Sequence, residues 1–318
     1  MKQSPVVVRR RRTGTDVMET RIESAVEARV GLLTGDASRG LDRLRRAADV
    51  LQAAESGDRQ IRSTFTLWAR QEQVFADVVH YVWRAAEHVA ATGEAYMFGR
   101  LIQPPRTGKS VIIGELIAAT AGTALILVPR KTLVEQMRHS LMRQMPTLKV
   151  GCYYQDEKSL RRDGVNVMTY QSLLRLVASG ALPVWLRDPL FLFVDEGHHA
   201  MTVERMRVLH EVFGAATLRI ALTATPDYSA LRVLSEHFPE LIHEMTFREA
   251  LMLDLLAPVK YWMRLIEADA SLVGVRGGDY DEETLGRILS ELPFFQAALE
   301  ERFGSPERAS KSALITCA

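Results

Sequence analysis

The stretch from Ala95 to Thr120, AYMFGRLIQPPRTGKSVIIGELIAAT, decides how the rest of this 318-residue chain is interpreted. Residues 96–102 form a short and mostly apolar run, and residues 103–108 interrupt it with two prolines and a glycine. Apolar residues then recur at helical spacing, at Ile113, Leu116 and Ile117. This order of patterns predicts a strand, a tight loop and a helix.

A tight loop that feeds a helix is suited to phosphate, because unpaired backbone N–H groups and the positive end of the helix dipole point at one spot. Lys109 would reach the β- and γ-phosphates of a nucleotide, and the Ser110 hydroxyl would bind magnesium. The loop resembles a Walker A loop in its second half only. Gln103 stands where a small residue belongs, and Arg106 stands where a glycine is usual in such loops. The alternative is an ordinary turn with a solvated lysine.

Composition and charge limit the classes of protein that fit. A chain of this length with 47% hydrophobic residues can bury a full core, and about two domains are expected. The net charge of +1 excludes a strongly basic overall field, so any contact with nucleic acid must be local. Cys152 and Cys317 are isolated, which favours a reducing compartment. No apolar run reaches 18 residues, so we expect a soluble, cytoplasmic protein with no membrane partner.

The residues before the phosphate loop are predicted to form an arm and then helices. Residues 1–16 are basic and lack apolar periodicity, which indicates a flexible arm that either touches phosphates or is merely solvated. Residues 17–65 have helical periodicity and predict a small helical hairpin. Residues 66–89 predict another amphipathic helix. Gln71, near its start, is either a surface residue or a reader of the adenine edge, since an amide both donates and accepts.

Polar residues follow several predicted strands. Residues 123–128, 150–154 and 165–169 are apolar runs of strand length. The carboxyl ends of parallel strands meet at one edge of a sheet, and a phosphodiester backbone could bind there. The candidate nucleic-acid contacts at this edge are Arg130, Lys131, Thr169, Gln171 and Ser172.

Residues 190–199, LFLFVDEGHH, lead an apolar strand into two carboxylates. Because neighbouring side chains on a strand diverge, Asp195 can hold magnesium while Glu196 orients and deprotonates a water. The alternative is a buried strand ending in a solvated acidic turn. His198 and His199 lack the further ligands that a zinc site needs. Another strand, in residues 219–226, ends in Thr223, Ala224 and Thr225, which could sense the acidic site.

Five motifs occur in the order QPPRTGKS, LVPRKTLVEQ, VMTYQSL, VDEGHH and ALTATP. This ordered set resembles the superfamily-2 helicases, nearest to the DEAH-like branch that includes the type III restriction-enzyme helicase subunit. The resemblance covers about Leu67 to Ala318. It implies an α/β fold, a RecA-like P-loop NTPase domain over residues 66–258 with a mostly parallel sheet between helices. It also implies ATP and Mg²⁺ as cofactors, nucleic acid as partner, DNA more than RNA, and further subunits of a restriction or repair system.

The resemblance assigns a role to each matching residue. Lys109, Asp195 and Glu196 would be catalytic, Ser110 and Asp195 would bind magnesium, and Gln71 would bind adenine. His198 and residues 223–225 would couple the nucleotide to the nucleic acid. Gly197 replaces a usual alanine, which we expect to be a small change. The phosphate loop would comprise Gln103, Pro104, Pro105, Arg106, Thr107, Gly108, Lys109 and Ser110.

Residues 259–318 are predicted to hold a linker and the opening strand of a second RecA-like domain, SALITCA at residues 312–318. The later family motifs are missing, so we expect a fragment of a longer protein, and we expect this fragment alone to hydrolyse ATP at close to the background rate. The first functional hypothesis is a nucleic-acid-dependent ATPase, a helicase or translocase. The second is a nucleotide-responsive nucleic-acid-binding module that does not hydrolyse effectively. A small-molecule P-loop kinase is a third, but it leaves ALTATP unexplained.

Overall fold

The computed structural model describes residues 37–56, 63–229, 232–257, 275–276 and 279–280. The chain divides into two units, Met1–Pro258 and Val259–Ala318. In the second unit, the described residues form one antiparallel pair, β11 (Val275–Arg276) with β12 (Asp279–Tyr280). The predicted arm at residues 1–16 and the predicted strand at residues 312–318 lie outside the described residues.

An eight-stranded sheet runs through the first unit in the order β10-β1-β7-β6-β2-β5-β3-β4. Its pairs are parallel except for β3 with β4. The strands are β1 (Gly99–Ile102), β2 (Ala124–Val128), β3 (Val150–Tyr153), β4 (Lys158–Ser159), β5 (Val165–Thr169), β6 (Phe191–Asp195), β7 (Leu218–Thr223) and β10 (Glu240–Glu244). A separate hairpin joins β8 (Asp227–Ser229) to β9 (Arg232–Val233).

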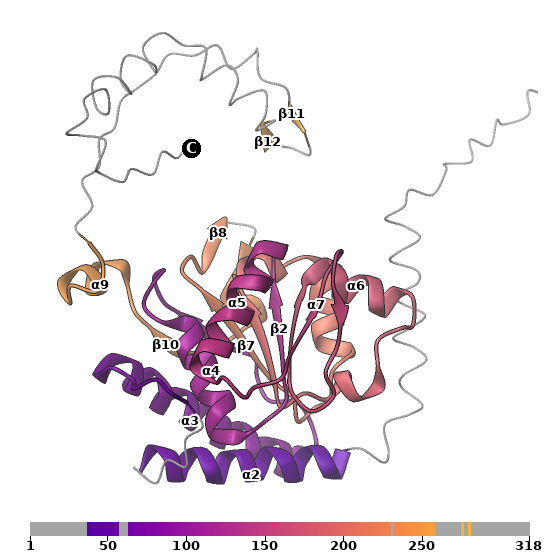
Figure 1. The fold of residues 1–318 in the computed structure, drawn as a ribbon, viewed down its shortest axis with the longest axis horizontal. Helices are drawn as coiled ribbons and strands as arrows, with labels where there is room; N and C mark the ends of the chain where they lie inside the picture. The colour runs from indigo at the N-terminus through magenta and orange to yellow at the C-terminus, as the bar shows by residue number, and fades with distance from the viewer. Residues whose placement is uncertain (1–36, 57–62, 230–231, 258–274, 277–278, 281–318) are drawn as a thin grey trace, which may run out of the picture. The chain divides into compact units, whose positions relative to one another are not determined.

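Both faces of the sheet are covered, as Figure 1 shows. Along β2, Ala124, Ile126 and Val128 pack into one core, and Leu125 and Leu127 pack into the other. This alternation explains why a parallel strand reads as a continuous apolar run. The first core includes α3 (Ala69–Thr92), α4 (Lys109–Thr120) and α5 (Lys131–Gln144). The second includes α6 (Tyr170–Ala178), α7 (Val203–Glu211) and α8 (Leu234–His237). The predicted α/β fold with a mostly parallel sheet between helices is confirmed.

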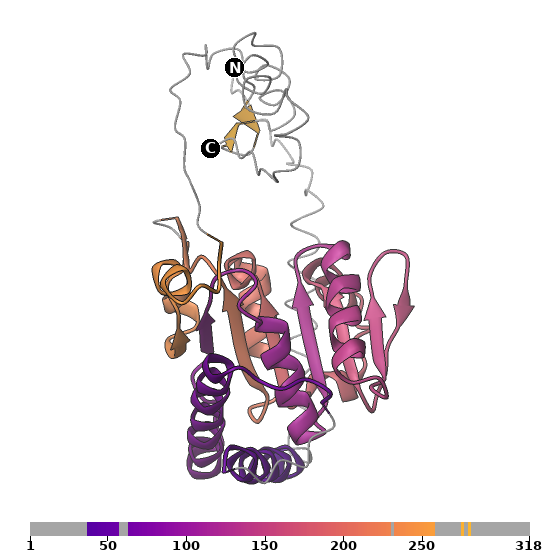
Figure 2. The same cartoon turned by 60° about the vertical axis from the view of Figure 1, so that its left-hand side comes forward.

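The predicted N-terminal helical hairpin is represented by one described helix, α2 (Ala37–Glu55). Its apolar residues, including Leu44 and Leu51, join the same core as α3 and α4. Figures 1 and 2 show α2 and α3 side by side at the base of the sheet. A Cβ at Gly40 would lie 3.1 Å from the Cβ of Ala216, just before β7, so α2 passes close to the amino end of that strand. The part of the prediction at residues 17–36 lies outside the described residues.

Local chemistry sets some boundaries differently from the predicted ones. The helix expected from residue 66 begins at Ala69, because the Gln71 side chain accepts a hydrogen bond from the Trp68 N–H and caps the helix there. Four short elements were not predicted. They are edge strand β10, α9 (Phe247–Met252) and the 3-10 helices η1 (Val184–Arg187) and η2 (Gly197–Ala200). None of the helices within the described ranges has the length and apolarity needed to cross a membrane.

Candidate nucleotide and magnesium site

Strand β7 lies between β1 and β6 and so brings three distant segments to one edge of the sheet. Ile102, at the end of β1, pairs with Thr223, and Asp195, at the end of β6, pairs with Leu222. The phosphate loop, the threonine segment and the two carboxylates therefore leave the sheet together. Ligands of open α/β sheets bind outside this edge.

The loop between β1 and α4 is held in a tight conformation. The Thr107 hydroxyl donates to the Pro104 carbonyl oxygen at 2.8 Å. Gly108 has φ 98°, and a Cβ there would lie 2.2 Å from Gln71 Nε2, so both the backbone and the space require glycine. Helix α4 begins at the next residue, Lys109. The unpaired backbone N–H groups of its first turn therefore point at the space above the loop.

Arg106 lies in the left-handed region of backbone conformation, with φ 65°. This geometry explains why a glycine is usual at this position. An L-residue there costs roughly 1–2 kcal/mol. The Arg106 side chain is exposed and lines the cavity above the loop, so its charge is available at the place where phosphates would bind.

A cavity of about 440 Å³ joins the loop to the acidic end of β6; it is lined in part by Arg106, Lys109, Ser110, Asp195 and Glu196. Lys109 Nζ donates to the Gln103 carbonyl oxygen at 3.0 Å. Burial lowers the pKa of Lys109, and the carboxylates of Glu196 and Asp195 partly oppose that shift. The cavity therefore holds a half-buried cation, Lys109, facing two carboxylates.

The two carboxylates occupy different environments. Burial raises the pKa of Asp195 to about 6, the Glu196 charge adds to the shift, and Lys109 opposes it. Glu196 has φ 50° and ψ 57°, so the chain turns sharply where β6 ends. The Tyr170 hydroxyl donates to the Asp195 backbone carbonyl oxygen at 2.6 Å and fixes the strand end. Asp195 thus ends the strand, and Glu196 begins the turn that follows it.

His198 lies between the acidic turn and the threonine segment. Its Nδ1 is 3.1 Å from Thr223 Oγ1, 3.4 Å from Thr225 Oγ1 and 3.6 Å from Glu196 Oε2. Thr223 Oγ1 also accepts from the Thr225 N–H at 3.1 Å. Ala224 lies between these two threonines and contributes no side-chain hydrogen bond. A shift of Glu196 could therefore reach β7 through one imidazole.

The expectation that glycine at residue 197 is a small change from alanine is wrong. A Cβ on Gly197 would lie 2.9 Å from the Cβ of Ala221 in β7 and 3.3 Å from Leu234 Cδ1. The acidic turn packs too closely on the neighbouring strand for a methyl group without a shift. In this chain the glycine is a packing requirement.

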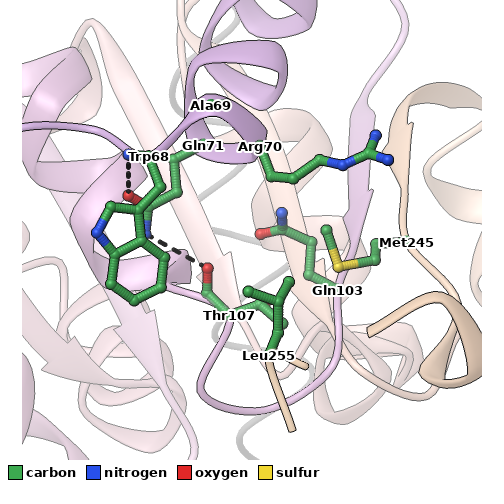
Figure 3. A pocket seen from close by; sticks show the side chains of 8 residues that line it. All are labelled: Trp68, Ala69, Arg70, Gln71, Gln103, Thr107, Met245 and Leu255. Atoms are coloured by element: carbon green, nitrogen blue, oxygen red, sulfur yellow. Dashed lines mark hydrogen bonds between the residues drawn. The ribbon is translucent and has the colours of Figure 1, made fainter. Parts of the chain in front are cut away.

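Gln71 lies under the phosphate loop, at the start of α3. Its Oε1 accepts from the Trp68 N–H at 3.1 Å, and its Nε2 donates to the Thr107 carbonyl oxygen at 3.5 Å. Figure 3 shows both contacts at the rim of a second cavity, which Gln103 also lines. Gln71 is buried, so a surface role is excluded.

The candidate nucleic-acid residues differ in what their side chains do. Arg130 is exposed just before α5, and Lys131 pairs with Asp156 at 3.6 Å. Thr169 caps α6 by accepting from the Ser172 N–H, and its hydroxyl lies 2.8 Å from the buried Ser172 hydroxyl. The side chains of Thr169 and Ser172 are thus engaged with each other at the start of α6, and Gln171 is exposed between them.

A sequence model of the family described as "Type III restriction enzyme, res subunit" matches residues 70–228, half of the chain. This chain belongs to that family. The match begins just before Gln71 and ends after the threonine segment, so it spans every site residue that the sequence predicted. The resemblance to superfamily-2 helicases is confirmed at the level of the family.

Solved structures add a distant likeness. The Pyrococcus furiosus Hef helicase domain is 20% identical, over 49% of this chain and 36% of that one, with a TM-score of 0.39. A nuclease-deletion mutant of the Type ISP restriction-modification enzyme LlaGI, in complex with a DNA substrate mimic, is 20% identical over 60% of this chain and 21% of that one, with a TM-score of 0.44. The Sulfolobus solfataricus SWI2/SNF2 ATPase core, in complex with dsDNA, is 15% identical over 56% of this chain and 36% of that one, with a TM-score of 0.42. The chain thus spans about a fifth to a third of their lengths. No curated protein matches.

The structure also adds residues that the family motifs did not indicate. The Ser140 hydroxyl, on α5, donates to the Ser110 hydroxyl at 3.2 Å. Trp68, Met245 and Leu255 line the second cavity together with Gln103. The exposed aromatic beside Gln71 was the one sequence signal for this cavity, since the other two residues come from a distant segment. Within the described ranges, no cluster of three His, Cys, Asp or Glu side chains surrounds His198 and His199 or any other point.

Proposed function

We propose that this chain is the nucleotide-binding part of a nucleic-acid-dependent ATPase of the superfamily-2 helicase type. One observation carries the proposal: Lys109 and Ser110, at the start of α4, share a cavity with Asp195 and Glu196, which lie far along the chain. A helix N-terminus, a half-buried cation and two carboxylates form the set of groups that a magnesium–nucleoside triphosphate needs.

The residues fit both cofactors. Hydroxyl and carboxylate oxygens, here Ser110 and Asp195, are ligands that Mg²⁺ prefers, and it usually keeps several waters as well. Lys109 would exchange the Gln103 carbonyl oxygen for phosphate oxygens. When bound, magnesium–ATP supplies a γ-phosphoryl group whose transfer needs mainly positioning and charge neutralisation.

Glu196 is the proposed base. Its carboxylate lies past the end of β6, lines the cavity and is partly exposed, so it can accept a proton from a water. His198 would relay its position to Thr223 and Thr225. The left-handed Arg106 would place a second positive charge beside the phosphates.

Nucleic acid is the proposed partner, and DNA is favoured because the family is a restriction-enzyme subunit. Arg130 and Lys131 are exposed before and at the start of α5, and Gln171 is exposed at the start of α6. These positions follow β2 and β5, which are neighbours in the sheet. Contacts there would reach the phosphodiester backbone and carry little sequence information. The family description also favours further subunits as partners.

The test is phosphate release from magnesium–ATP by the 318-residue chain, alone and with single-stranded DNA, double-stranded DNA or single-stranded RNA. Glu196→Gln should bind magnesium–ATP as the unchanged chain does and lose at least tenfold of any nucleic-acid-stimulated release, because only the group that handles water is changed. Release that persists in Glu196→Gln would remove Glu196 as the base.

The second candidate function is a nucleotide-responsive nucleic-acid-binding module without effective hydrolysis. The observation that favours it is Arg106, whose side chain occupies a position where the backbone usually approaches the phosphates unhindered. DNA affinity that changes with magnesium–ATP, with no phosphate release under any condition, would select this function over the first.

A further inference from the structure

We propose that Ser140 is a positioning residue for magnesium, because its hydroxyl orients the Ser110 hydroxyl toward the metal. The inference rests on the proposed function, in which Ser110 is a magnesium ligand, and it adds a residue from a second helix to that site. Ser140 belongs to none of the five sequence motifs, and it lies on α5, whereas Ser110 lies on α4.

The two hydroxyls meet at the wall of the phosphate cavity. Ser140 Oγ donates to Ser110 Oγ at 3.2 Å, and both residues line the cavity of about 440 Å³ that also contains Lys109. Both serines are half-buried. Within the described ranges, each hydroxyl has the other as its only hydrogen-bond partner. Neither is therefore engaged there with a backbone carbonyl oxygen of its own helix, which is the common alternative for a helical serine.

This bond leaves the Ser110 oxygen ready to bind a metal. A serine hydroxyl has one O–H donor and two acceptor lone pairs. The Ser140 proton occupies one lone pair of Ser110 Oγ, so the other lone pair remains for magnesium. The Ser110 side chain has three staggered positions, and the contact with Ser140 favours the one seen in the structure. Without that contact, the hydroxyl can turn to a backbone carbonyl oxygen instead.

Helix α5 is anchored on α4 one turn beyond Ser140. Gln144 Nε2 donates to the Val111 carbonyl oxygen at 3.1 Å and lies 3.3 Å from Glu115 Oε2. A Cβ on Gly114 would lie 2.0 Å from Gln144 Oε1, so the glycine lets the two helices approach. Gln144 is fully buried. The amide therefore holds α5 at a fixed distance from α4.

The same contacts fix the register of the two helices. Ser110 meets Ser140, and Gly114 meets Gln144, so the partners advance by four residues on each helix. Residues four apart lie on one face of a helix. Figure 1 shows α4 and α5 side by side. The Ser140 hydroxyl is thus held by a packed helix with a buried anchor, which is what a positioning residue requires.

A group that holds a metal ligand contributes to metal affinity without touching the metal. Loss of such a group typically costs about 10- to 100-fold in metal affinity. Mg²⁺ demands near-ideal octahedral geometry, so its binding depends on how each ligand is oriented. Loss of the Ser140 hydroxyl should therefore change the magnesium dependence of nucleotide binding and leave magnesium-free binding as it was.

The experiment is calorimetric titration of ADP into the 318-residue chain, in EDTA and over a series of magnesium concentrations. Magnesium should tighten ADP binding by the unchanged chain. In Ser140→Ala, the magnesium concentration that gives half of this tightening should rise about tenfold, while ADP affinity in EDTA should stay the same. Ser140→Thr, which keeps the hydroxyl, should resemble the unchanged chain. Thr132→Ala is the matched control, because it removes an exposed hydroxyl from the start of the same helix.

The outcomes separate this inference from the proposed function. An unchanged magnesium dependence in Ser140→Ala would overturn the positioning role and leave the nucleotide site intact. An equal loss of ADP affinity with and without magnesium would also overturn it, since Ser140 would then contact the nucleotide or support the fold. Impairment of Ser140→Thr as large as that of Ser140→Ala would show that the hydroxyl is not responsible. Absence of ADP binding by the unchanged chain under all conditions would overturn the proposed function as well.

Discussion

At the scale of single residues, the site depends on two left-handed backbones that are not glycine. Arg106 has φ 65° and Glu196 has φ 50°. One lies in the phosphate loop and the other at the acidic strand end, so both flank the same cavity. Such conformations cost about 1–3 kcal/mol and persist where the surrounding structure imposes them. Their presence at this cavity is consistent with a functional constraint on both.

Replacement of Arg106 separates backbone from charge. Arg106→Asn tolerates the left-handed backbone and removes the guanidinium, whereas Arg106→Lys keeps a charge. We expect Arg106→Asn to weaken magnesium–ADP binding about tenfold, because one charge-assisted contact to phosphate is lost. Arg106→Lys should weaken binding less, because the lysine retains a charge for that contact. Calorimetry measures both. Tighter binding by Arg106→Asn would show that the side chain obstructs the phosphates instead.

Asp195 makes stability depend on pH. Its pKa rises from 3.8 to about 6 on folding, chiefly through burial, so the folded chain holds a proton that the unfolded chain releases. The free energy of unfolding therefore falls as pH rises from about 4 to about 6. Above that range the folded chain bears the full cost of burying the ionised Asp195 carboxylate.

Asp195→Asn should remove this penalty. At pH 8 the variant should be more stable than the unchanged chain by up to about 3 kcal/mol, and at pH 4 the difference should be small. Urea unfolding at both pH values is the measurement, with Asp163→Asn, an exposed aspartate, as the control. An equal effect of Asp195→Asn at pH 4 and pH 8 would contradict the assigned burial of the charge.

At the scale of elements, the turn between β6 and η2 must fit closely on β7. Gly197→Ala should destabilise the chain by about 1–3 kcal/mol, because its methyl group would meet the Cβ of Ala221 at 2.9 Å. Urea unfolding gives the cost. In the double variant with Ala221→Gly, part of the lost stability should be recovered, because the methyl group that the new alanine meets is gone. Additive costs would show that the close approach is not the cause.

Helix α5 carries the proposed backbone contact. Arg130→Ala should weaken binding of single-stranded DNA and lower the salt slope of the binding constant by about 1, because one phosphate contact is lost. Fluorescence anisotropy over a salt series measures this. Lys149→Ala is the matched control, since it removes one exposed charge just before β3, at the opposite edge of the sheet. Equal effects of the two variants would point to a general charge effect.

At the scale of the whole molecule, the central strands and the phosphate loop were predictable from sequence because each buried parallel strand reads as an apolar run. The first helix start was placed three residues early because Gln71 caps it at Trp68. Edge strand β10 was missed because its polar residues, Glu240, His243 and Glu244, leave an apolar run of only two residues. Edge strands lack the two-sided burial that gives the central ones their signal.

The site was predictable in its residues and less so in its arrangement. Lys109, Asp195 and Glu196 stood out by residue type and order. The cavity beside Gln103 is completed by Met245 and Leu255, which come from a segment more than 140 positions later. The crowding at Gly197 depends on β7. Such contacts between distant segments leave no local pattern.

The central claim is that the start of α4 and the end of β6 form one magnesium–nucleotide site. The most direct measurement is calorimetric titration of magnesium–ATP into the 318-residue chain, Lys109→Ala and Asp195→Asn. We predict that Lys109→Ala loses measurable binding and that Asp195→Asn still binds ATP without added benefit from magnesium. Unchanged affinity in Lys109→Ala, with its fold intact by circular dichroism, would contradict the account.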